Sequence, residues 1–69
     1  MNEELKDFFV RNNAERRYKR YYLEFNRYSL ILDGSMVFID DEEDVIGVHK
    51  PTIEQVKALI YGLTGKQLE

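Results

Sequence analysis

The spacing of apolar residues at the start of the chain is helical. Leu5, Phe8 and Phe9 recur at intervals of three and four residues, which places them on one side of a helix. Two glutamates occupy the first turn, where they suit the helix dipole, and Asn2 is the expected N-cap. The pattern predicts a short N-terminal helix over residues 3–12.

Alternation with a period of two follows in the segment YSLILDGSMVFI, residues 28–39. Asp33-Gly34 between two apolar runs is a strong β-hairpin signal and predicts a type I′ turn with Leu32 opposite Ser35. The predicted core face carries five residues: Tyr28, Leu30, Leu32, Val37 and Ile39.

The other face of this hairpin is also mostly apolar and should be covered as well. It carries Ser29, Ile31, Met36 and Phe38. Two alternatives remain open at this point. Either the N-terminal helix packs on this face, or the face meets a second copy of the chain in a homodimer.

The C-terminal segment has the clearest helix signals. Thr52 and Gln55 form the S/T-x-x-E/Q capping box, and Gly65 is a suitable residue to end the helix. Apolar residues at helical spacing lie between them: Ile53, Val56, Leu59, Ile60 and Leu63. We expect a helix over residues 53–64, with residues 45–48 as a further short strand before it.

The densest stretch is RRYKRYYLEFNRY, residues 16–28, which combines basic and aromatic residues. Residues 20–25 alternate as a strand, although a basic amphipathic helix fits the same segment with only Leu23 misplaced. The strand is favoured because aromatic residues are dense and Leu23 needs burial. Apolar positions are odd-numbered up to Phe25 and even-numbered from Tyr28, so we expect a turn or bulge at residues 26–27.

These elements predict an α+β fold formed by residues 1–69 as a single small domain. Its expected parts are the N-terminal helix, an antiparallel meander of three or four strands with a type I′ hairpin at Asp33-Gly34, and the C-terminal helix packed on the sheet. A chain of 69 residues buries only about 60% of its unfolded surface, so the core is thin.

Charge and composition add limits. The net charge is −3, with seven basic residues against five acids in residues 1–32 and three against eight in residues 33–69. The chain has no cysteine, and its first residues carry acids where a signal peptide carries positive charge. No stretch approaches the ~20 apolar residues of a membrane span. We expect a soluble, cytoplasmic protein that does not bind membranes.

Candidate catalytic and metal-ligating residues are few. We expect no catalytic residues, no cofactor and no metal site, and therefore no enzyme. The acidic run at residues 40–44 lacks the alternation and the glycine of a calcium loop. His49 is the one histidine, and the glycines form no phosphate-binding pattern.

The basic aromatic stretch is therefore the candidate partner-binding surface. Its expected contact residues are Arg16, Arg17, Tyr18, Lys19, Arg20 and Tyr22. Tyr and Arg are enriched in protein interfaces, which favours a small protein-binding module, accessory or inhibitory, that forms a homodimer if the second sheet face is shared. The alternative is a single-stranded nucleic-acid-binding protein that uses residues 16–28. A structural interpretation also holds, in which the arginines lie over aromatic rings as cation–π pairs.

Overall fold

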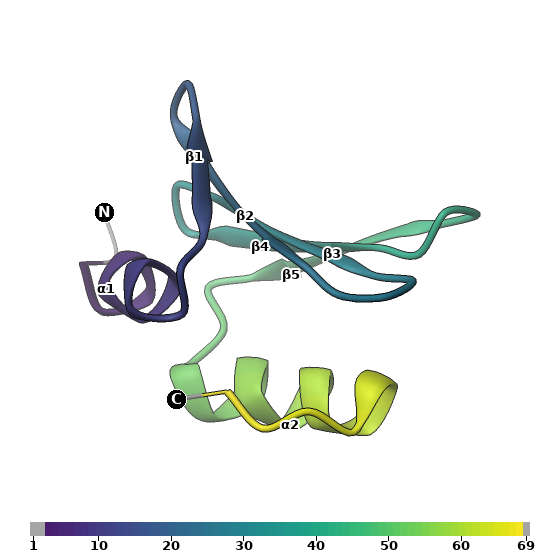
Figure 1. The fold of residues 1–69 in the computed structure, drawn as a ribbon. Helices are drawn as coiled ribbons and strands as arrows, with labels where there is room; N and C mark the ends of the chain where they lie inside the picture. The colour runs from purple at the N-terminus through teal and green to yellow at the C-terminus, as the bar shows by residue number, and fades with distance from the viewer. Residues whose placement is uncertain (1–2, 69) are drawn as a thin grey trace.

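The computed structural model describes residues 3–68 and has two helices and five strands in this part of the chain (Figure 1). Their order is α1 (Glu3–Arg11), β1 (Glu15–Arg17), β2 (Arg20–Glu24), β3 (Ser29–Asp33), β4 (Met36–Asp40), β5 (Val45–His49) and α2 (Ile53–Thr64). The strands form one antiparallel meander in sequence order. The α+β prediction is confirmed, and the proposed cap Asn2 lies outside the described residues.

The strand count corrects the prediction of three or four. Strand β1 folds back on β2 through a tight turn at Tyr18 and Lys19, with Arg17 opposite Arg20. Its three residues are all charged and exposed, so no alternation of apolar residues marks it. An edge strand is held by backbone hydrogen bonds, which do not require a hydrophobic side chain.

The strand interpretation is confirmed for residues 20–24, because β2 pairs along its whole length with β3 and ends one residue before Phe25. Leu23 is buried, as the strand prediction required. The change of parity falls where it was expected. Phe25 and Tyr28 exchange both backbone hydrogen bonds, at 2.7 and 3.2 Å, across a two-residue turn at residues 26–27.

The predicted register of the hairpin between β3 and β4 is wrong by two residues. The turn residues are Gly34 and Ser35, so Leu32 pairs with Val37 rather than with Ser35. A type I′ turn needs positive φ at both central residues, and only Gly34, at 64°, has it, so the predicted turn type is not confirmed. A shift of two residues keeps every side chain on its face, and the predicted core face is therefore correct.

Both helices pack on the same side of the sheet (Figure 1). The core joins three groups of buried side chains: Leu5, Phe8 and Phe9 of α1, Val56 and Ile60 of α2, and Leu23, Leu30, Leu32, Val37 and Ile39 of the sheet. The suggestion that α1 covers the second hairpin face is therefore wrong. Phe8 and Phe9 of α1 are buried in the core on the helix side of the sheet, where α1 also contacts α2.

Helix α2 begins and ends as its sequence predicts. The Thr52 hydroxyl accepts from the amide of Gln55 at 3.1 Å, and the Gln55 side chain accepts from the amide of Thr52 at 2.9 Å. At the other end Gly65 has φ 76° and its amide donates to the carbonyl of Tyr61 at 2.8 Å. These caps satisfy backbone groups that the helix itself leaves unpaired.

Candidate protein-binding surface

The side of the sheet that faces away from the helices carries an apolar centre, and we call this side the open face. Cross-strand pairing aligns Tyr22 of β2, Ile31 of β3 and Phe38 of β4 in one row, with Met36 beside Phe38 on the same strand. These four side chains are only half-buried, because within residues 3–68 both helices lie on the opposite side. Residues of this type normally need a covering layer or a partner.

Gly47 extends this row to β5, where it pairs with Phe38. A Cβ atom placed on Gly47 would lie 3.1 Å from the Cε1 atom of the Phe38 ring and 3.3 Å from the terminal methyl of Met36. The ring of Phe38 therefore leans over the glycine. Gly47 serves as a close-approach position, and the strand pairing continues through it without a bulge.

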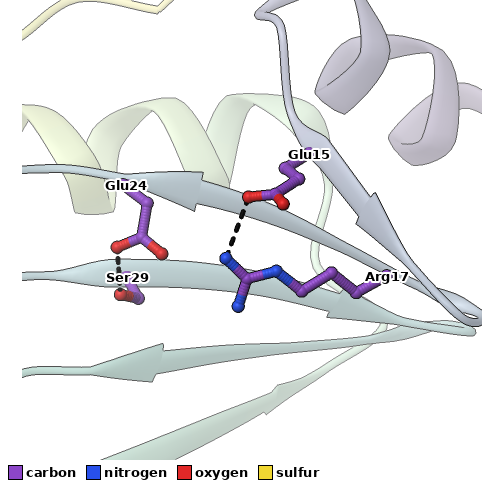
Figure 2. A network of polar contacts seen from close by, with 4 residues as sticks. All are labelled: Glu15, Arg17, Glu24 and Ser29. Carbon is purple, nitrogen blue, oxygen red and sulfur yellow. Dashed lines mark hydrogen bonds and ion pairs between the residues drawn. The ribbon is translucent and has the colours of Figure 1, made fainter.

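Charged and polar side chains surround this centre. Arg17 donates to the Glu15 carboxylate at 2.9 Å, and the Ser29 hydroxyl donates to Glu24 at 2.8 Å, as Figure 2 shows across β1, β2 and β3. The hydrogen bond with Arg17, followed by its charge, lowers the pKa of Glu15. Exposed pairs of this kind contribute little to stability, but they fix where the charges lie.

Arg20 forms the second ion pair on this face, with its Nε atom 3.0 Å from a carboxylate oxygen of Asp33. The Tyr22 hydroxyl and then the charge of Asp33 raise the pKa of Arg20. The rim of the open face thus holds two arginines and four carboxylates: Arg17, Arg20, Glu15, Glu24, Asp33 and Asp40. A phosphate backbone would meet more negative than positive charge here.

Tyr18 stands apart at the tip of the hairpin between β1 and β2. Its side chain is 95% exposed and its φ is 58°, in the left-handed region that bulky residues rarely adopt. Glycine or asparagine would hold this turn at a lower conformational cost. We therefore include Tyr18 in the candidate surface, since strained residues often lie at functional sites.

The six predicted contact residues do not form one surface. Arg17, Arg20 and Tyr22 lie on the open face, while Tyr18 and Lys19 form the hairpin tip. Arg16 points to the helix side, where its guanidinium lies 5.9 Å from the Tyr21 ring and donates to the carbonyl of Tyr18.

The cation–π interpretation is confirmed for two of the four arginines in residues 16–28, Arg16 and Arg17. The guanidinium of Arg17 lies 5.0 Å from the ring centroid of Tyr22 on the open face, and that of Arg16 lies over Tyr21 on the other side at 5.9 Å. Sequence reasoning did not include Ile31, Met36 and Phe38 among the six contact residues, although it offered their face for contact with a second copy of the chain. The sequence did indicate that the second face of the hairpin is apolar and needs to be covered. It did not indicate that neither helix covers this face.

A partly open cavity of about 350 Å³ lies below the hairpin tip on the helix side. Its lining combines three cations with one carboxylate and one aromatic ring: Lys6, Arg16, Lys19, Tyr21, Leu32, Asp33 and Gly34. The cavity therefore brings together Lys6, Arg16 and Lys19, while the carboxylate of Asp33 is also paired with Arg20.

The acidic loop between β4 and β5 is locally ordered by its own carboxylates. Asp41 accepts hydrogen bonds from the amides of Glu43 and Asp44, at 3.0 and 2.8 Å, and these bonds lower its pKa. In the part of the chain that the structure describes, no group of three or more His, Asp or Glu side chains is placed to hold a metal ion. The loop forms a turn built on Asp41.

Neither helix within residues 3–68 has the length and apolar character of a membrane span. No protein-family model, curated protein or solved structure matches this chain.

Proposed function

We propose that this protein is a small non-catalytic protein-binding module, an accessory or inhibitory factor that acts through the open face and the tip of the first hairpin. The observation that supports this most strongly is the half-buried row of Tyr22, Ile31 and Phe38 on the side of the sheet away from both helices. An apolar centre with a charged rim is the usual arrangement of a protein interface.

The arginines and tyrosines fit this role. Arg17 is held over Tyr22, and Arg20 is held by Asp33, so these side chains lose little further freedom when a partner binds. Tyr and Arg are the residues most often found at energetic centres of interfaces. The mixed charge of the rim favours a polypeptide over a polyanion.

The test is affinity capture from a lysate of the source organism with matched surface variants. Tyr22→Thr combined with Phe38→Thr removes the aromatic centre and keeps residues that suit a strand. Tyr61→Ala on the exposed side of α2 is the control. We expect the unmodified protein and the control to retain the same protein, and the double variant to lose it.

Two outcomes contradict the proposal. In the first, no protein is retained above background by the unmodified chain. In the second, the double variant retains the partner as well as the α2 control does, while circular dichroism shows that both variants are folded.

A further inference from the structure

The outer edge of β5 is the least protected edge of the sheet. Within residues 3–68, β5 pairs only with β4, and its other side has no strand beside it. Edge strands are commonly protected by charged side chains, as in β1, whose three residues are all charged. Strand β5 reads VIGVH, and Val45 and Ile46 are each 61% exposed.

The backbone groups that β5 turns outward can be assigned from its hydrogen bonds to β4. The amide of Lys50 donates to the carbonyl of Ser35 at 2.9 Å, so in this antiparallel ladder alternate residues direct their N–H and C=O groups inward. Val45, Gly47 and His49 therefore direct theirs away from the sheet, ready to pair with another strand.

We propose that two copies of this chain pair along β5, antiparallel and related by a two-fold axis at Gly47, to form one continuous ten-stranded sheet. In this register Gly47 lies opposite Gly47 of the second copy, and Val45 lies opposite His49 of the second copy. All outward backbone groups of the strand then find partners. This inference does not depend on the proposed function.

The side chains in this register are self-complementary. Asp44 of one copy comes next to Lys50 of the other, and the two-fold axis makes this charge pair occur twice. Ile46 comes opposite Val48 on the helix side of the sheet, since both lie on the face that carries Ile39 and Val37.

That helix side has room for the incoming residue. An open groove of about 410 Å³ is lined by Val48 of β5 and by Gln55, Ala58 and Leu59 of α2. The exposed Ile46 of the second copy would enter the mouth of this groove beside Val48. Pairing thus covers an apolar side chain that the isolated chain leaves in water.

The opposite side of the sheet is also compatible with pairing. Gly47 has no side chain, and the ring of Phe38 leans over it. Two facing glycines leave the space between the two Phe38 rings free of other side chains. The alternative of β5 pairing with β1 of the next copy would continue without closing and would produce open-ended assemblies.

The test is the mass of the purified protein by analytical ultracentrifugation across micromolar to millimolar concentrations. The monomer mass is 8.3 kDa, and we expect twice this mass at high concentration. Lys50→Glu and Asp44→Lys each place like charges together twice, and each should weaken dimerisation about tenfold. The double variant Asp44→Lys with Lys50→Glu exchanges the charges and should restore it.

Amide hydrogen exchange on the unmodified protein gives a second readout that needs no variant. The amides of Val45, Gly47 and His49 should become protected as the dimer forms. A monomer at every concentration, assemblies that grow beyond two copies, or a dimer in which these amides exchange freely and the charge variants have no effect would each overturn the proposal.

Discussion

At the residue scale, Tyr18 shows the clearest conflict between local preference and the position it occupies. It holds φ 58° in a two-residue turn while its side chain is almost fully exposed. The left-handed conformation costs an ordinary residue roughly 1–2 kcal/mol, and the ring recovers little of this by packing. The sequence thus keeps a destabilising residue at the hairpin tip.

Replacement of Tyr18 by asparagine should therefore stabilise the fold by about 0.5–1 kcal/mol, because asparagine tolerates this backbone conformation. The measurement is the midpoint of urea unfolding. Lys19→Asn, at the adjacent turn residue without positive φ, is the control and should bring no such gain. A loss of stability in Tyr18→Asn would show that the tyrosine ring supports the hairpin instead.

At the scale of the element, β3 separates the two faces of the sheet within one strand. Leu30 is completely buried under the helices, whereas its neighbour Ile31 is half-buried on the open face. The cavity left by a large-to-small substitution is costly only where surrounding groups cannot relax and water cannot enter.

Leu30→Ala should cost about 3 kcal/mol, and Ile31→Ala about 1 kcal/mol or less. Because small proteins have only about 0.05–0.15 kcal/mol of stability per residue, roughly 3.5–10 kcal/mol for this chain, the first change should remove a large share of the total stability. Thermal and urea unfolding of the two variants make the comparison. Equal losses would mean that the open face is covered in solution as firmly as the core.

At the scale of the whole molecule, the distribution of charge decides between the two binding hypotheses. The chain is acidic overall, and the arginines of the open face are paired with Glu15 and Asp33. Single-strand binders need unpaired cations along a groove, with bases stacked on aromatic rings. Here the cavity lined by Lys6, Arg16 and Lys19 lies on the other side of the sheet from Tyr22, so these cations and that ring do not share one groove.

We therefore expect no measurable binding of single-stranded oligonucleotides at physiological salt, and weak binding at most at low salt. Fluorescence anisotropy over a salt series measures this. The matched variant replaces Arg16, Arg17, Lys19 and Arg20 by alanine. Tight binding with a steep salt dependence that this variant flattens would establish the nucleic-acid function and contradict the prediction.

The sequence by itself determined most of the local structure. Both helices, the caps of α2, the turn after Phe25 and the faces of β3 and β4 follow from spacing and from residues with few conformational choices. These features depend on contacts within a few residues, so a single sequence contains the information. Strand β1 was not predicted, because an edge strand is held by backbone pairing and this pairing requires no pattern of side chains.

Only the tertiary structure decided which face is covered. The sequence pattern predicted that both faces of the hairpin are apolar, and α1 was one candidate to cover the second face. In the structure α1 packs with α2 on the core face instead. Packing the apolar side chains of both helices into one core buries more surface than dividing them between two thin layers, and a short chain has too few to fill both. The open face of the sheet is the physical consequence of this packing.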